Sequence, residues 1–130
     1  MRMILATLLA SAFTAAYAQD AAPASHDGTW AMTGANSDGR SFDAELVLEG
    51  DGGTWRLYAR GGAATKSNPC LMRKFPVTVQ KSTVEELTFH VDGPKVIAGC
   101  NEFTATLRRV DDSSFDGSLG GTWTTHLARK

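Results

Sequence analysis

Histidine, serine and acidic side chains are the groups in this sequence with the chemistry for acid–base catalysis or metal binding. The three histidines, His26, His90 and His126, are far apart in the chain, and no cysteine or carboxylate stands at metal-ligand spacing from them. Catalysis by a histidine base would need a carboxylate within about 3 Å of His90 or His126 in a cleft. No Gly-x-Ser-x-Gly motif marks a nucleophilic serine. We therefore expect a protein that is not an enzyme and that uses no metal or cofactor.

Cys70 and Cys100 are the only cysteines, and their chemistry depends on the compartment. Residues 1–18 predict a secretory signal peptide, because Arg2 is followed by an apolar run and then by Ala16-Tyr17-Ala18, the small-x-small form of a cleavage site. An even pair of cysteines in an exported chain indicates a disulfide, and two free buried thiols are the alternative. We expect a periplasmic or secreted protein with a Cys70–Cys100 disulfide.

Each of the three tryptophans, Trp30, Trp55 and Trp123, follows a Gly-Thr pair. The glycine can close a turn, and the threonine can begin a strand that carries the indole on one face. We interpret the three side chains as core residues, and the wall of a ligand pocket is the alternative.

A second candidate for binding is the stripe formed by Arg56, Tyr58 and Arg60, which alternate along one predicted strand. The stripe is a candidate surface contact for an anionic partner, and an ordinary solvated strand face is the alternative. The longest unpatterned segment, 61–69, follows the stripe and is a candidate recognition loop, because binding residues often lie on loops held by a rigid scaffold.

Alternating apolar and polar residues predict an all-β domain, as in 41–48, where Phe42, Ala44, Leu46 and Leu48 share one face. Turn-forming residues separate eight such segments, which predict a single antiparallel meander, either a barrel or a barrel-like sandwich, with one disulfide. Pro76 should break or bulge the fourth strand. About eighteen inward apolar side chains should fill the interior and leave little or no cavity. The predicted strands span 29–33, 41–48, 54–60, 71–80, 86–91, 101–110, 114–119 and 122–128.

Two spatial expectations follow from the meander. Cys70 and Cys100 precede two strands that run in the same direction, so both should lie at the same end of the sheet, within bonding reach. The first and last strands should close the barrel, and we expect this closure to bring Trp30 and Trp123 close together.

The chain divides into the signal peptide at 1–18, a disordered lead-in at 19–27 that carries a solvated His26, and a single β-barrel domain at 28–130. Cleavage removes one basic residue and leaves 12 against 14 acidic residues, a net charge of −2 that argues against nucleic acid as a partner. No apolar run is long enough to cross a bilayer as a helix, so we expect no transmembrane segment. We expect a monomer.

Gly28-Thr29-Trp30 at the start of the first predicted strand resembles the Gly-x-Trp motif that opens lipocalins and other calycin barrels, and the opening is also similar to that of avidin-type barrels. In such families a basic side chain near the last strand often packs over this tryptophan, and the resemblance implies this role for Arg129. The lipocalin Thr-Asp-Tyr motif and the tryptophans of an avidin biotin pocket are not matched, so the resemblance implies a barrel and no particular ligand. The whole pattern also resembles small uncharacterised exported proteins of Gram-negative bacteria.

These observations favour a non-enzymatic binding protein whose partner is another exported protein, such as a protein inhibitor or an interaction module. A calycin-like carrier of a small apolar ligand is the alternative. The barrel interior separates the two functions. An interior with no void above about 100 Å³ would exclude the carrier, because ligand pockets usually measure several hundred Å³.

Overall fold

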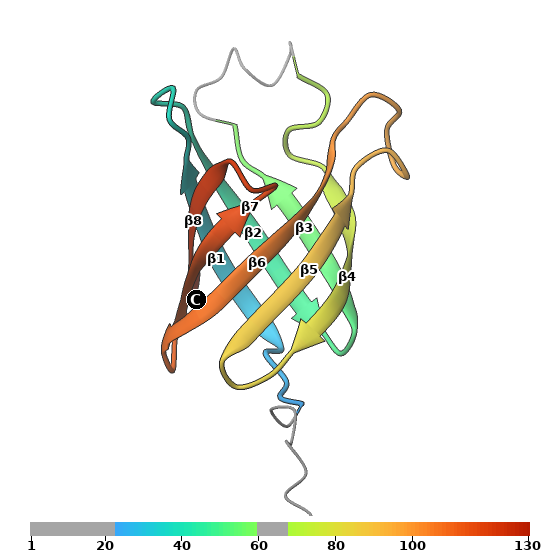
Figure 1. Ribbon diagram of the computed structural model, residues 1–130. Helices are drawn as coiled ribbons and strands as arrows, with labels where there is room; N and C mark the ends of the chain where they lie inside the picture. Colours follow the sequence, from blue (N-terminus) through green and yellow to red (C-terminus); the bar gives the residue numbers. More distant parts are fainter. Residues whose placement is uncertain (1–22, 60–67) are drawn as a thin grey trace, which may run out of the picture.

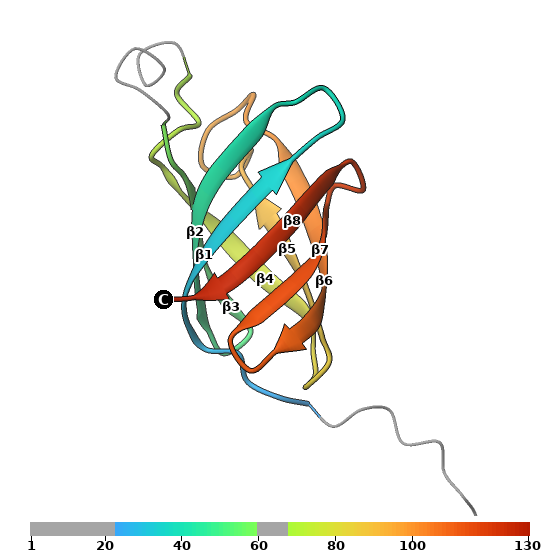
Figure 2. The same cartoon turned by 90° about the vertical axis from the view of Figure 1, so that its left-hand side faces the viewer.

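The computed structural model describes residues 23–59 and 68–130, which form a closed barrel of eight antiparallel strands (Figure 1). Each strand pairs with its neighbours in sequence, and β1 also pairs with β8 to close the barrel (Figure 2). The predicted signal peptide, residues 19–22 of the lead-in, Arg60 and 61–67 of the candidate loop lie outside the described residues. The strands are β1 (Gly28–Ala35), β2 (Ser41–Glu49), β3 (Gly52–Leu57), β4 (Lys74–Ser82), β5 (Glu86–Asp92), β6 (Glu102–Asp111), β7 (Ser114–Leu119) and β8 (Trp123–Arg129).

The all-β prediction is confirmed, and the architecture is a closed barrel rather than a sandwich. Strand β5 shows why the sequence folds in this way. Its Leu87, Phe89 and Val91 are fully buried, and the residues between them are only half-buried. The period of two therefore places one face of the strand inside the barrel and the other on its surface. In the part of the chain that is described, no helix is long and apolar enough to cross a membrane.

The connection between β3 and β4 is longer than the alternation predicts. Strand β3 ends at Leu57 instead of 60, and β4 begins at Lys74 instead of 71. Between them the chain turns at Met72, whose φ is +62° and whose backbone N–H donates to the Leu57 carbonyl at 2.7 Å. Residues 71–73 therefore belong to a turn and not to the strand.

Pro76 does not bulge β4, which corrects the expectation for this residue. It lies within the strand opposite Thr54 of β3, and the pairing of β4 with β5 begins only at Val77. The irregularity of β4 falls instead between Val79 and Lys81. A proline is tolerated at a strand position where one neighbouring ladder has not yet begun.

The end of the barrel at which the described chain enters, called here the closed end, is filled by packed side chains. Trp30 and Phe115 are buried there, and their rings meet edge to face with centroids 5.7 Å apart. Residues 23–27 of the predicted lead-in pack against this end rather than lying free. The His26 carbonyl accepts a hydrogen bond from Trp30 Nε1 at 2.9 Å, and the His26 ring lies 4.9 Å from that of Phe115. His26 is therefore partly buried, and the expectation that it is solvated is wrong.

Arg129 packs over Trp30, as the resemblance to calycin barrels implies. The guanidinium carbon lies 4.2 Å from the indole centroid, a distance typical of a cation–π contact. Its Nη1 also donates to the Asp27 carbonyl at 2.8 Å. The last strand thus holds both the first strand and the segment before it.

The expectation that Trp30 and Trp123 lie close together is wrong. Strands β1 and β8 do pair, but Trp30 lies opposite Arg129, and the pairing ends at Ala35–Thr124. Arg129 lies six positions after Trp123 along β8, a distance of roughly 20 Å in an extended strand. Both tryptophans stand near the start of their strands, and paired antiparallel strands start at opposite ends of a sheet.

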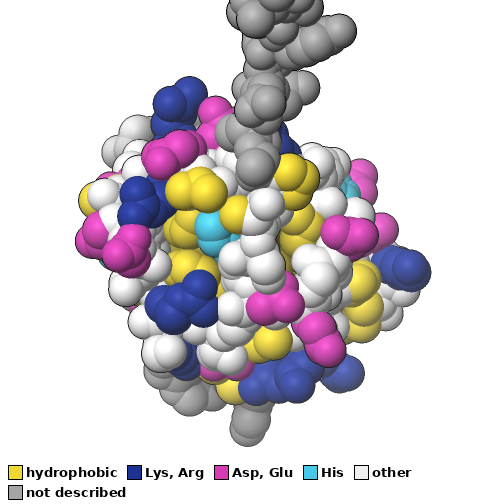
Figure 3. Space-filling view, turned by 90° about the horizontal axis from the view of Figure 1, so that it is seen from below, with side chains coloured by type: hydrophobic (Ala, Val, Ile, Leu, Met, Phe, Trp, Pro, Cys, Tyr) yellow, Lys and Arg dark blue, Asp and Glu magenta, His cyan; other side chains and the backbone are white. Residues whose placement is uncertain are grey.

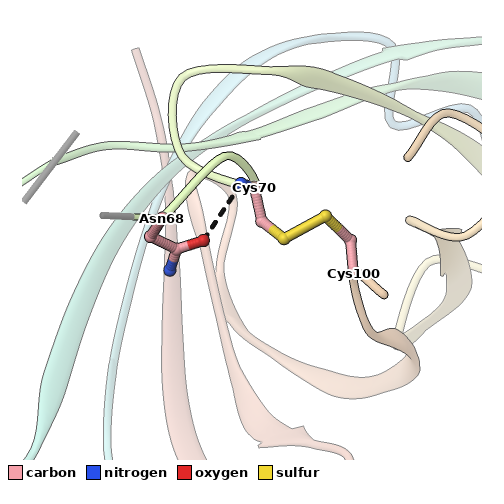
Figure 4. Close-up of a disulfide and its surroundings, with 3 residues drawn as sticks. All are labelled: Asn68, Cys70 and Cys100. Carbon is pink, nitrogen blue, oxygen red and sulfur yellow. Dashed lines mark hydrogen bonds between the residues drawn. A yellow bond between two sulfur atoms is a disulfide. The ribbon is translucent and has the colours of Figure 1, made fainter. Parts of the chain in front are cut away.

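The disulfide joins Cys70 and Cys100 at the opposite end of the barrel, called here the open end (Figure 4). Their Cα atoms lie 5.7 Å apart, so the prediction that both cysteines reach the same end is confirmed. Asn68 Oδ1 accepts a hydrogen bond from the Cys70 backbone N–H at 3.0 Å. The bridge therefore links the β3–β4 connection to the β5–β6 connection across the end of β5.

We expect Cys70→Ser to lower the free energy of unfolding by about 2–4 kcal/mol without changing the fold, because the bridge restricts the unfolded chain. Denaturant unfolding followed by circular dichroism measures the change. The Cys70→Ser/Cys100→Ser double variant, which leaves no unpaired thiol, should show the same loss. A melting temperature of the wild-type protein that does not respond to reductant would contradict the prediction.

Candidate functional site

The open end of the barrel contains a cavity of about 590 Å³, called here the mouth cavity. Four aromatic residues, two leucines and a rim of polar or small residues line it. They are Arg40, Ser41, Phe42, Trp55, Leu57, Asn101, Glu102, Phe103, Leu119, Gly120, Thr122 and Trp123. A smaller hollow of about 270 Å³ lies beside the disulfide and shares Trp55, Leu57, Asn101 and Phe103 with it. The expectation that side chains fill the interior and leave little or no cavity therefore holds at the closed end and is wrong at the open end.

The topology of the meander explains which side chains reach the mouth cavity. Odd-numbered strands end at the open end, and even-numbered strands begin there. Leu57 and Leu119 are the last residues of β3 and β7, whereas Phe42 and Phe103 are the second residues of β2 and β6. These four lining residues were missed by sequence reasoning. Strand direction combined with alternation was the signal that could have located them.

The aromatic side chains of the mouth cavity contact one another edge to face. The Phe42 ring meets Trp123 at 5.4 Å and Trp55 at 6.5 Å between centroids, and Trp55 meets Phe103 at 4.8 Å, all close to perpendicular. Edge-to-face contacts of this kind are favourable. Phe42 also packs on Gly34, where an added Cβ would lie only 2.3 Å from the ring. The glycine makes room for the ring, which holds the wall in place.

The structure divides the three candidate tryptophans between the two ends of the barrel. Trp30 lies in the packed closed end, and its N–H is satisfied by the His26 carbonyl. Trp55 also belongs to the buried core, as predicted, and it borders the mouth cavity together with the partly buried Trp123. Trp55 Nε1 is buried with no hydrogen-bond partner in the described part of the chain, and the same holds for Thr125 Oγ1 inside the barrel wall. Unsatisfied buried polar atoms are rare in a pure packing core, because each costs roughly 1–3 kcal/mol.

The candidate surface stripe faces a carboxylate of its own chain. Arg56 pairs in register with Glu45 of β2, and Glu45 forms an ion pair with Lys130 at 2.7 Å. The hydrogen bond from Lys130 is the largest cause that holds the pKa of Glu45 below its usual value, followed by one from Tyr58. Lys130 also lies 6.0 Å from the Tyr58 ring. Arg56 and Tyr58 therefore belong, with Lys130, to a network of side chains of this chain around the Glu45 carboxylate. Arg60 lies outside the described residues.

The other two histidines lie on the outer surface of the barrel, each beside a carboxylate. His126 Nδ1 is 2.5 Å from Asp116 Oδ1, and His90 Nε2 is 3.3 Å from Glu102 Oε2. The His126–Asp116 distance meets the first requirement for a histidine base. A shallow hollow of about 470 Å³ adjoins the pair, but no hydrogen bond joins His126 to a hydroxyl group among the described residues. The His126–Asp116 pair is a cross-strand contact between β7 and β8, and His90 also contacts a hydroxyl group, since its Nδ1 lies 3.0 Å from Thr104 Oγ1.

No group of three or more His, Cys, Asp or Glu side chains in the described ranges 23–59 and 68–130 could hold a metal ion. A hollow of about 950 Å³ lies beside residues 23–25 at the closed end, and its wall consists mostly of polar and charged residues of β4 and the adjoining turns. Pro23, Ala24 and Val79 are its apolar side chains, and it has none of the aromatic side chains that often line small-molecule sites.

No family model matches this chain, and no curated protein matches it. Among solved structures, the chain is similar to a redesigned β-barrel, with 16% sequence identity and a TM-score of 0.49. The match covers 80% of this chain and 90% of the redesigned barrel. The class of protein shown by the coordinates themselves is an eight-stranded antiparallel β-barrel with one disulfide, which is consistent with an oxidising compartment.

We expect Lys130→Gln to destabilise the protein near pH 7 and to have no effect in acid. A carboxyl group whose pKa is lowered by folding stabilises the protein above its unfolded pKa of about 4.3, and this contribution is lost as the pH falls through the lowered value. The difference in the free energy of unfolding between Lys130→Gln and wild type should therefore vanish as Glu45 is protonated. Unfolding measured across this pH range tests the expectation.

Lys95→Gln is the matched control, because Lys95 forms no salt bridge within the described residues. Its effect on the free energy of unfolding should be small and should not follow the titration of Glu45. A Lys130→Gln effect that stays constant between neutral and acid pH would show that the ion pair is not its cause.

Proposed function

We propose that this protein binds a small, largely apolar ligand in the mouth cavity. The observation that carries the proposal is the unfilled volume of about 590 Å³ at the open end. It exceeds the limit of about 100 Å³ below which a carrier would be excluded, and it lies in the range of small-molecule sites. The partly buried Phe42, Phe103 and Trp123 offer aromatic surface to such a ligand, and the buried Trp55 contacts the rings of Phe42 and Phe103.

Two properties of the wall support this function over simple packing. The aromatic residues of the mouth cavity are held by mutual edge contacts and by the close fit of Phe42 on Gly34, so the cavity exists before a ligand arrives. A preformed site loses less conformational freedom on binding. The buried N–H of Trp55 has no partner among the described residues, and a ligand acceptor that displaces its neighbours would satisfy it.

A protein partner remains the competing proposal, since this is the function that the sequence favours. Met72 and Val96 are 42% and 48% exposed on the two connections joined by the disulfide, and exposed apolar side chains of this kind occur at protein interfaces. The two proposals differ in whether the cavity itself takes up a ligand. An experiment with a small apolar probe therefore separates them.

The probe 1-anilinonaphthalene, which is neutral and fluoresces in apolar surroundings, tests the proposed function. We expect saturable binding of one probe per chain. Leu57→Arg places a charge in the cavity wall and should weaken binding at least about tenfold, which corresponds to ~1.4 kcal/mol. Thr106→Arg adds the same side chain to the exposed outer face of β6 and should leave the affinity unchanged.

Circular dichroism and a cooperative unfolding transition establish that both variants are folded. A wild-type protein that shows no saturable binding would refute the proposal. Equal affinity of Leu57→Arg and wild type would also refute it, because the probe would then bind elsewhere.

A further inference from the structure

The two ends of the barrel differ in charge as well as in packing. The described turns at the open end carry three basic side chains, Arg40, Arg73 and Lys95, and one acidic side chain, Asp38. The described turns and termini at the closed end carry one basic and four acidic side chains, which are Lys130, Asp27, Asp51, Glu85 and Asp112. Figure 3 views the closed end and shows both acidic and basic side chains around its margin. The described turns therefore carry a net positive charge at the open end and, with the described termini, a net negative charge at the closed end.

Ion pairing adds to this difference in charge between the two ends of the barrel. At and near the closed end, Lys81 pairs with Glu86, Arg109 with Glu85 and Asp112, and Lys130 with Glu45. The basic side chains of the open-end turns form no salt bridge within the described residues. Glu102, the acidic residue of the cavity rim, lies 3.3 Å from His90. Arg129 at the closed end also forms no salt bridge within the described residues, but its guanidinium packs over Trp30 and donates to the Asp27 carbonyl.

Arg40 is the basic residue that lines the mouth cavity itself. Its backbone is fixed, because its N–H donates to Asn36 Oδ1 at 3.0 Å and its carbonyl accepts from the Asn36 N–H at 3.0 Å. The position of the side chain at the rim, two residues before Phe42, follows from this turn. A guanidinium group presents paired N–H donors that suit the oxygen atoms of an organic acid.

From these observations we propose that the ligand is an amphipathic organic anion. Its apolar body occupies the aromatic mouth cavity, and its acid group lies at the rim against Arg40. This inference rests on the proposed function and adds the chemical class of the ligand. The acid group stays partly hydrated at the rim, so binding does not require the burial of an unpaired charge.

Two probes that differ only in an acid group test the assignment. The neutral probe 1-anilinonaphthalene has a sulfonated counterpart, 8-anilinonaphthalene-1-sulfonate, with the same aromatic body. We expect Arg40→Gln to weaken binding of the sulfonated probe about threefold to tenfold at low ionic strength, the range of an exposed charge pair in weakly screened solvent. Binding of the neutral probe should change less than about twofold, since its contacts are apolar.

Arg108→Gln is the matched control, because it removes the same charge from an exposed position on the outer face of β6, away from the mouth cavity. Arg108→Gln should change the affinity for neither the neutral nor the sulfonated probe. The loss caused by Arg40→Gln should shrink in about 0.5 M salt, where charges more than a few ångströms apart are screened.

The outcomes distinguish this inference from the function on which it rests. If both probes bind the wild type but Arg40→Gln weakens both equally, or neither, the ligand class is wrong and the cavity remains a binding site. The same conclusion holds if Arg108→Gln weakens binding of the sulfonated probe as much as Arg40→Gln does. If neither probe binds the wild type, both the proposed function and the ligand class are wrong.

Discussion

The pairing of β1 with β8 is the interaction on which the rest of this structure depends. Every other strand pair joins neighbours in sequence, whereas this pair joins the two ends of the domain through six residue pairs. It removes both open edges of the sheet, which would otherwise expose unpaired backbone groups. It also places Arg129 over Trp30 and ties the segment before β1 to the last strand. Because closure fixes the register around the whole barrel, it decides which side chains meet at each end.

The two ends that result from this register are physically different. At the closed end, residues 23–27 pack across the opening, the Trp30 N–H is hydrogen-bonded, and nearby charges are paired. At the open end, the Trp55 N–H has no partner within the described residues, and the aromatic side chains border a cavity. A core that served only stability would fill such a volume, because apolar surface left in contact with water is unfavourable. The asymmetry is what makes the open end the candidate site.

The disulfide and one glycine contribute to the form of the open end in different ways. Cys70 and Cys100 link two connections across the end of β5, so the rim there cannot separate freely. Gly34 lets the Phe42 ring lie against the backbone of β1, where any side chain would displace it. Together they limit the motion of the wall. A rim held in this way favours binding with a small loss of conformational freedom.

The sequence by itself determined the eight strands and the disulfide, which depend on local alternation, on turn residues, and on which strands run in the same direction. The position of Arg129 over Trp30 was implied by the resemblance to calycin barrels. Trp30 and Trp123 lie at opposite ends because paired antiparallel strands start at opposite ends of a sheet, a constraint already contained in the predicted meander. Tertiary structure alone decided the register of β1 against β8, which sets the height of each residue along the barrel. It alone also decided that Phe42, Leu57, Phe103 and Leu119 surround a cavity. Alternation identifies the residues that point inward, but whether their volumes fill the space depends on packing across all eight strands.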